Sequence, residues 1–318
     1  MTPELFITRH NQLIDPVVHV WAWQIPVYLF LGGWVAGNMI LTGYFMLGGR
    51  HTRRSPLLSA LPGLSLVLLS LGMLALFLDL EHKAYVWRLY TTFQWTSPMS
   101  WGSWILLLVY PALVVTWLVR PPVIIEDLSQ TVERITTTLQ GRRDIVRTIG
   151  VTSMVLGVAL GVYTGVLLSS LVARPLWNTG ILGVLFLASG VSAAAAFGHL
   201  VTHSPDERAL TVRIDNVVLA SELGILTLFL VAMLNGNAQQ VDAASLVLGG
   251  PFTAPFWVFV VGLGIVIPLI IQLLAVRHWI QHTPIAPIMV LAGGLALRWV
   301  LVLAGQVSRW APGTMGMH

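Results

Sequence analysis

Seven side chains that can donate, accept or exchange protons lie within or beside apolar stretches in the first 171 residues, and we call them the first polar group. An ionisable group inside such a stretch is costly in a membrane, so it is a candidate functional residue. Gln24 and Tyr28 are four residues apart, which places them on one face of a helix. The group consists of His19, Gln24, Tyr28, Asp79, His82, Tyr163 and Thr164.

Three more charged residues, the second polar group, lie in or at the ends of apolar stretches closer to the C-terminus. They are Asp215, Glu222 and Arg298. A lone charge of either sign is unfavourable in lipid, so we expect Glu222 and Arg298 to pair or to be bridged by water. Two interpretations stay open: a proton path that enters at Asp215, and a structural ion pair.

These residues need apolar helices to position them. The chain has 318 residues, of which 56% are hydrophobic and 9% are charged, whereas a soluble domain carries about 25% charged residues. The apolar stretches are continuous and long enough to cross a hydrocarbon core of roughly 30 Å as helices, which excludes a β-barrel. We predict an all-α integral membrane protein of about eight spans, near 20–47, 56–79, 101–119, 147–171, 181–200, 214–236, 256–276 and 284–306.

The basic residues between these spans predict the orientation, because cytoplasmic loops are enriched in lysine and arginine. The loops after spans one, three, five and seven contain eleven of them: Arg50, Arg53, Arg54, Arg120, Arg134, Arg142, Arg143, Arg147, Arg208, Arg213 and Arg277. The termini and the other loops contain five: Arg9, Lys83, Arg88, Arg174 and Arg309. Both termini are therefore expected on the outer side of a bacterial or archaeal cytoplasmic membrane, with the first polar group in the outer leaflet. The net charge of +4 is spread over short loops, so it does not indicate a nucleic-acid partner.

Two loops are long enough to have structure of their own. The loop 120–146 contains Leu128, Val132, Ile135 and Leu139 at helical spacing, which predicts a surface helix with one apolar face. The loop 80–100 is rich in aromatic residues. It is either an interfacial aromatic belt or a docking surface for a partner on the outer face.

The composition also limits the cofactors. The chain has no cysteine, so it cannot hold an iron–sulfur cluster through thiolates. Haem b needs two histidines that face each other from neighbouring spans, and none of the nine histidines lies in the middle of a span. The pairs His199 and His203, and His278 and His282, lie at helix ends and are typical of head-group contacts. We therefore expect neither haem nor an iron–sulfur cluster in this chain.

The first polar group fits the headgroup of a membrane quinone, menaquinone or ubiquinone. Such a headgroup takes up or releases two protons with two electrons, and its carbonyls need hydrogen-bond donors. Trp21, Trp23 and Phe30 can line an apolar slot for the ring and tail. The alternative is that each polar side chain only hydrogen-bonds a neighbouring helix, and the glycines of spans one and four let helices approach closely.

Several motifs resemble the NrfD/PsrC family, the membrane subunits of polysulfide-reductase-like complexes. The resemblance extends from about residue 20 to the end of span five and is plausible through span eight. The motifs are Tyr-Leu-Phe-Leu-Gly-Gly-Trp-Val-Ala-Gly at 28–37, Leu-Asp-Leu at 78–80, Trp87-Arg88, Thr-Ser-Pro-Met-Ser-Trp-Gly at 96–102, Gly-Val-Tyr-Thr-Gly at 161–165 and Arg-Pro-Leu-Trp at 174–177.

The resemblance implies two four-helix bundles, 1–171 and 172–318, with both termini outside and a quinone site near the outer face of the first bundle. It also implies an outer partner with four cubane iron–sulfur clusters. That partner belongs with a molybdenum or tungsten bis-pterin enzyme or with multihaem cytochromes. Tyr163 matches the quinone-contacting tyrosine of the family, and Gln24 and Tyr28 match its polar first-helix positions. Glu222 and Arg298 resemble its proposed proton-channel residues.

We therefore predict the quinone-reactive membrane anchor of a multisubunit oxidoreductase, which is not catalytic alone. Asp79 and His82 would exchange protons, and the loop 80–100 would dock the iron–sulfur subunit. Two alternatives come from other classes of protein. One is a secondary transporter or ion channel with a site at Glu222 and Arg298, and the other is a purely structural anchor.

Overall fold

The computed structural model describes residues 21–48, 55–80, 82–122, 130–171, 174–202, 204–277, 279, 281 and 283–308. Ten residues named in the sequence analysis lie outside this part of the chain: Arg9, His19, Arg50, Arg53, Arg54, Leu128, His203, His278, His282 and Arg309.

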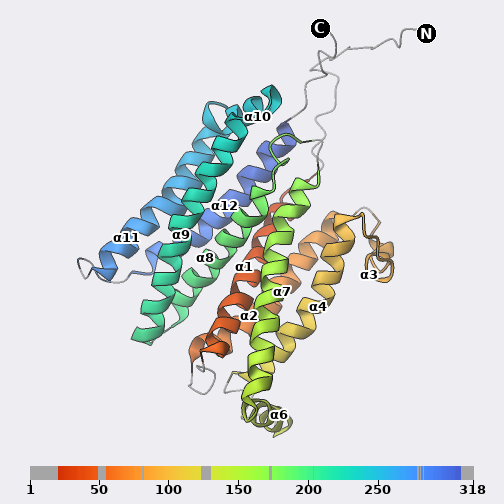
Figure 1. Ribbon diagram of the computed structural model, residues 1–318, viewed down its shortest axis with the longest axis vertical. Helices are drawn as coiled ribbons and strands as arrows, with labels where there is room; N and C mark the ends of the chain where they lie inside the picture. The colour runs from red at the N-terminus through yellow and green to blue at the C-terminus, as the bar shows by residue number, and fades with distance from the viewer. Residues whose placement is uncertain are drawn as a thin grey trace.

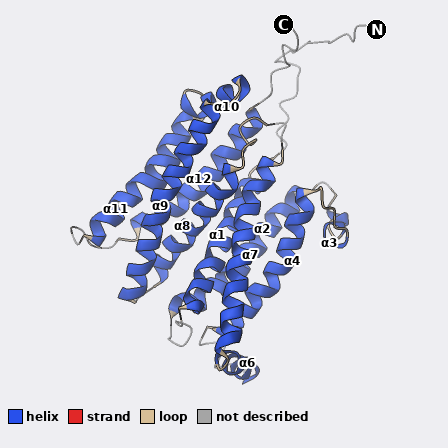
Figure 2. Cartoon of the chain, in the orientation of Figure 1, coloured by secondary structure: helices blue, strands red, loops and turns tan. Residues whose placement is uncertain are grey.

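The regular structure of the described residues is helical throughout (Figures 1 and 2). Eight helices are long and apolar enough to cross a membrane, which confirms the predicted all-α membrane protein. They are α1 (Gln24–Leu47), α2 (Pro56–Asp79), α4 (Pro98–Val119), α7 (Arg143–Ser169), α8 (Ile181–Val201), α9 (Pro205–Leu234), the π-helix η3 (Pro255–Val266) that continues as α11 (Ile267–Val276), and α12 (Ile285–Val307). Shorter elements are η2 (Lys83–Tyr85), α3 (Arg88–Thr91), α6 (Gln130–Gln140) and α10 (Ala238–Leu248).

Two of the long helices begin at least four residues earlier than the sequence predicts. The sixth span begins at Pro205 instead of residue 214, and the fourth begins at Arg143 instead of residue 147. Hydropathy detects only the part of a helix that lies in lipid, whereas charged residues extend it into the interface. Pro205 fits the first turn of a helix, and Asp206 in that turn interacts favourably with the helix dipole.

The helix α1 lies at the centre of the molecule. It packs against α2 and α7 and also against α8 and α12, while α8 in turn contacts α9 and α12 (Figure 1). Trp21 exchanges two hydrogen bonds of 2.9 Å with Gln306 and stacks on Trp177, with ring centroids 5.3 Å apart. We call the end of the molecule that contains these three residues the Trp21 face, and the opposite end the α6 face.

Glycines set how closely α1 approaches its neighbours. A Cβ atom on Gly37 would lie 2.1 Å from the carbonyl oxygen of Gly190 in α8, and one on Gly190 would lie 2.2 Å from that of Gly33. The same holds for α7, because a Cβ on Gly43 would lie 2.4 Å from the carbonyl oxygen of Gly150. The backbones therefore touch directly, as small residues allow in membrane helices.

The seventh span changes helix type along its length. The π-helix η3 gives way to α11 at Ile267, directly before Pro268. Proline has no N–H to donate, so it fits the start of a new helical segment. One turn after Pro268, α11 presents the buried Gln272 to α9.

The predicted surface helix between spans three and four is present as α6 at the α6 face. Thr136 donates a hydrogen bond of 2.9 Å to the carbonyl of Leu118, and Gln140 donates one of 2.8 Å to that of Val119. These two polar side chains satisfy carbonyls that the C-terminus of α4 leaves open. Ile135 stays 39% exposed, so part of the apolar face of α6 is uncovered.

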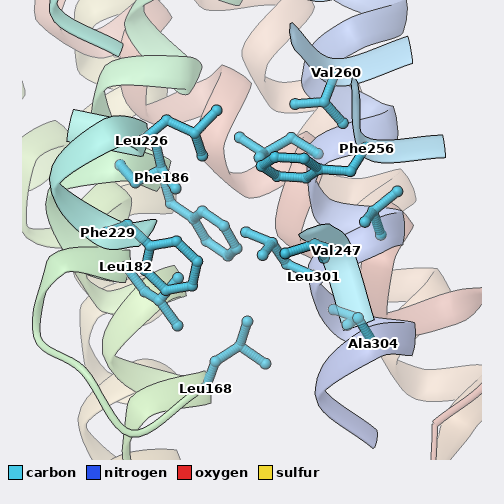
Figure 3. Packing of buried hydrophobic residues seen from close by; sticks show 14 of the residues in the cluster. Leu168, Leu182, Phe186, Leu226, Phe229, Val247, Phe256, Val260, Leu301 and Ala304 are labelled. Atoms are coloured by element: carbon cyan, nitrogen blue, oxygen red, sulfur yellow. The ribbon is translucent and has the colours of Figure 1, made fainter. Parts of the chain in front are cut away.

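The largest apolar core lies between α8, α9, η3 and α12. Phe186, Phe229 and Phe256 are fully buried there and pack with Leu182 and Leu301 (Figure 3). This core fixes the helices that carry the second polar group.

The glycine contacts generate the first prediction. The substitution Gly190→Val should destabilise the protein by about 2 kcal/mol or more, because the new side chain overlaps the backbone of α1. A thermal melt in mild detergent should show a melting temperature lower by about 5 °C or more.

The matched control is Gly224→Val in α9, where an added Cβ meets nothing within 4 Å. Equal melting temperatures for the two variants would contradict the close approach of α1 and α8.

Candidate functional site

Four tyrosines form a cluster that extends from the Trp21 face to the middle of α4, and we call them the tyrosine cluster: Tyr28, Tyr90, Tyr110 and Tyr163. Tyr28 of α1 is 3% exposed, and its hydroxyl lies near those of Tyr163 in α7 and Tyr90 in α3. Tyr90 interacts with Tyr110 of α4, whose hydroxyl lies 3.4 Å from that of Ser70 in α2. The structure thus brings together the predicted pair Tyr28 and Tyr163 and adds two hydroxyls to it.

Sequence reasoning missed Tyr90 and Tyr110. Tyr90 was one of many aromatic residues in the loop 80–100, and nothing in the loop marked it as different. Burial and the neighbouring Tyr110 raise the pKa of Tyr90 above its ordinary value. Tyr110 lies in the middle of a span, so a polar residue at that depth was a signal that could have identified it.

The position of Tyr163 depends on a glycine. A Cβ atom on Gly102 of α4 would lie 2.0 Å from the Tyr163 hydroxyl. Only glycine leaves room for the ring at this point, which accounts for the glycine at the end of the Thr-Ser-Pro-Met-Ser-Trp-Gly motif. Thr164 is different, because its hydroxyl donates to the carbonyl of Gly161 in its own helix.

Gln24 lies one turn from Tyr28, as predicted. Its Oε1 atom is buried and has no hydrogen-bond partner among the described residues. A buried acceptor of this kind usually bonds water or a ligand. Gln24 and Tyr28 thus lie on one face of α1, and Tyr28 lies near Tyr163.

Asp79 and His82 lie at the edge of this region. Asp79 is half-buried at the C-terminus of α2, and His82 is exposed. His82 lines a pocket of about 470 Å³ within the loop 80–100, together with Arg88 and Ser97. Both residues therefore lie nearer to the surface than Tyr28 and Tyr163, which are buried.

The expected apolar slot of Trp21, Trp23 and Phe30 is not formed. Trp21 stacks on Trp177, and Trp23 is 49% exposed. Phe30 points to the other side of α1, where its ring centroid lies 6.0 Å from the guanidinium carbon of Arg298. Helical spacing explains the error, because Phe30 is two residues from Tyr28 and faces a different neighbour.

The loop 80–100 presents aromatic rings to the surface. Phe93 packs edge-on against Trp95, Trp101 and Trp104, with centroids 4.8 to 5.3 Å apart. Trp95 is nevertheless 74% exposed. Both interpretations of this loop, membrane belt and docking surface, agree with such a cluster.

The second polar group is buried between the helices of the C-terminal half. Asp215 of α9 accepts hydrogen bonds of 2.6 Å from Ser192 of α8 and from Gln272 of α11. Glu222 lies two turns further along α9 and is 3% exposed. The two carboxyl groups interact electrostatically, so they form one buried acidic row.

Arg298 of α12 lies at the end of this row and is fully buried. It donates hydrogen bonds to the Ser189 hydroxyl, to the carbonyl of Gly294 (3.0 Å) and to that of Phe186 (2.8 Å). Glu222 and Arg298 are close enough to influence each other electrostatically, and Ser189 lies near both of them. The sequence did not indicate Ser189 as a neighbour of this expected pair.

Comparison with known proteins gives a consistent result. The family described as "Polysulphide reductase, NrfD" matches residues 8–309. The C subunit of polysulfide reductase from Wolinella succinogenes is 29% identical, over 90% of this chain and 94% of that protein. Protein NrfD of Escherichia coli is 31% identical, over 91% and 96% respectively. The NrfD homolog of Haemophilus influenzae is 28% identical, over 91% and 95%.

The matches cover all eight candidate spans and both polar groups. With its eight membrane-competent helices, this multi-pass membrane protein belongs to the NrfD/PsrC family.

Proposed function

We propose that this chain is the quinone-reactive membrane subunit of a respiratory oxidoreductase complex. The observation that carries the proposal is the tyrosine cluster together with Gln24. The amide oxygen of Gln24 is buried and has no hydrogen-bond partner among the described residues. A quinone headgroup has two carbonyl acceptors that become hydroxyl donors on reduction. Tyrosine hydroxyls and an amide can serve both forms.

Each residue of the site then has a role. Tyr28 and Tyr163 donate to the quinone carbonyls, and Gln24 accepts from the quinol hydroxyl. Asp79 and His82 lie closer to the surface, so they exchange the two protons with water on the Trp21 face. His19 would assist Asp79 and His82 in this proton exchange. Thr164 stabilises the turn of α7 beside Tyr163, because its hydroxyl bonds the carbonyl of Gly161.

The electrons must come from or go to another protein subunit, because the sequence contains no cysteine for an iron–sulfur cluster. The name of the Wolinella relative, as the C subunit of polysulfide reductase, indicates a complex of several subunits. For this protein we infer an iron–sulfur partner with four clusters that docks on the loop 80–100. A molybdenum or tungsten bis-pterin subunit or a multihaem cytochrome completes the complex.

The arrangement in the membrane follows from the same proposal. The contacts of α1 with α2 and α7, and of α8 with α9 and α12, support two four-helix bundles within 1–171 and 172–318. The Trp21 face, at which the described part of the chain begins at Trp21 and ends at Ser308, would be the outer face of a bacterial or archaeal cytoplasmic membrane. The described arginines beside α6, such as Arg142 and Arg143, support the opposite face as cytoplasmic.

The proposal predicts that the native complex contains an iron–sulfur subunit. Purification in mild detergent, followed by mass spectrometry of the subunits and a quinone-linked assay, should show that subunit and turnover that a quinone-site inhibitor blocks. A protein that purifies alone and has no quinone reaction would contradict the anchor role and make transport the function to test.

Within that complex, Tyr163→Phe should lower quinone turnover about five- to tenfold, because it removes one hydrogen bond of roughly 1 kcal/mol from the headgroup. Assembly should be unchanged, since the phenyl ring keeps its place against Gly102. Steady-state kinetics and subunit stoichiometry measure the two effects.

The matched control is Tyr44→Phe near the α6 face, where the tyrosine is 48% exposed. Normal kinetics in Tyr163→Phe would remove Tyr163 from the headgroup site.

A second proposal concerns the buried acidic row. Asp215, Glu222 and Arg298 would move protons from the α6 face towards α1 during turnover. The support is chemical: the buried Asp215 carboxyl accepts a hydrogen bond from Ser192, the buried Glu222 lies two turns further along α9, and Arg298 bonds Ser189 beside α1. Carboxyl and hydroxyl groups can pass protons between them, and buried carboxyl groups in membrane helices often serve this role.

The prediction is that Glu222→Gln abolishes proton movement coupled to turnover, because an amide cannot take up and release a proton at this point. Proteoliposomes with a pH-sensitive dye inside measure the movement, and quinone turnover in the presence of an uncoupler measures the chemistry separately. The control is Asp242→Asn in α10, an exposed position. Unchanged proton movement in Glu222→Gln would leave the row as a structural element.

A further inference from the structure

An apolar groove runs along the seam between α4 and α7, in the half of the molecule towards the α6 face. Its volume is about 380 Å³, and Leu108, Pro111 and Ala112 of α4 line one side. Thr148 and Leu156 of α7 line the other. The Thr148 hydroxyl donates to the carbonyl of Asp144 in its own helix (2.9 Å), so this threonine adds little polarity to the groove.

The groove follows from how α7 packs elsewhere. Gly150 and Gly157 draw α7 onto α1, because Cβ atoms on them would lie 3.1 and 2.8 Å from α1 atoms. The residues of α7 that line the groove lie on a different side of the helix from these two glycines. On the α4 side, Pro111 lacks an N–H and disturbs the helical bonding at this level, and Ala112 is too small to fill the space.

The same seam leads to the tyrosine cluster. Tyr163 meets Gly102 where α7 and α4 approach the Trp21 face. Leu156 lies seven residues before Tyr163 on α7, which corresponds to about 10 Å along a helix. From Leu156 to Thr148 the groove continues for about 12 Å.

We propose that this groove holds the isoprenoid tail of the quinone, an inference that rests on the proposed function above. A headgroup beside Tyr163 directs its tail along the α4–α7 seam. The tail reaches the groove after about 10 Å, so only the distal part of a long tail occupies it. The residues that line the groove belong to the membrane-spanning helices α4 and α7. Carbon atoms form nearly all of its surface, which suits a branched hydrocarbon chain.

A phospholipid acyl chain has similar chemistry, but two features favour the tail. The groove shares its helix pair with Tyr163 and Gly102. On α7, the groove also begins at Leu156, the lining residue nearest to Tyr163.

The test fills the groove and compares quinones that differ only in tail length. In the purified complex, Ala112→Phe should raise KM about tenfold for a quinone with a long isoprenoid tail, because burial of a few methylene groups is lost. KM for an analogue with a single isoprene unit should change less than about twofold, since so short a tail does not reach the groove. The kcat values should be unchanged for both.

The control is Val217→Phe on α9, a position that is 67% exposed and distant from the groove lining. An equal rise in KM for both quinones, or no rise for either, would overturn the tail site. So would the loss of a co-purified phospholipid, detected by native mass spectrometry in Ala112→Phe, with unchanged quinone kinetics. If the unsubstituted complex does not turn over quinone at all, the proposed function fails instead.

Discussion

The structure depends on the close approach of α1 to α8 and α7. Gly33 and Gly37 bring the backbone of α1 into contact with Gly190, and Gly43 does the same with Gly150. Lipid gives apolar side chains no reason to associate, so van der Waals contact between backbones supplies much of the packing energy of membrane helices. Because α1 is held on two sides at once, the residues along it face fixed neighbours in both halves of the molecule.

This central position makes α1 the link between the two polar groups. Tyr28 faces Tyr163 and the tyrosine cluster, whereas Phe30 and Gly33 face the guanidinium of Arg298. A Cβ atom on Gly33 would lie 2.9 Å from Arg298 Nη2, so the charge touches the helix that carries Tyr28. The proposed quinone chemistry and the proposed proton path therefore share one rigid element, and a shift of α1 would affect both.

The sequence predicted the parts of this arrangement that depend on hydropathy and on spacing along one helix. Eight apolar stretches became eight helices, and Gln24 and Tyr28 share a helix face. It did not predict which residues meet across helices, because that depends on helix rotation. Phe30 was therefore assigned to the wrong side of α1, and Tyr90, Tyr110, Ser189 and Gln272 were missed. A serine such as Ser189 is common in membrane helices, so its role can be recognised only when the residues that it bonds are known.

Ser189 also bears on the choice between a proton path and a structural ion pair. A direct salt bridge between Glu222 and Arg298 would satisfy both buried charges and hold them in place. Instead, the guanidinium bonds a hydroxyl and two carbonyl oxygens, and its Nε has no partner among the described residues. A hydroxyl can both donate and accept, so it can follow a change of protonation at Glu222 without a rearrangement of the helices. In the proposed function, Glu222 would therefore exchange its proton instead of only compensating the charge of Arg298.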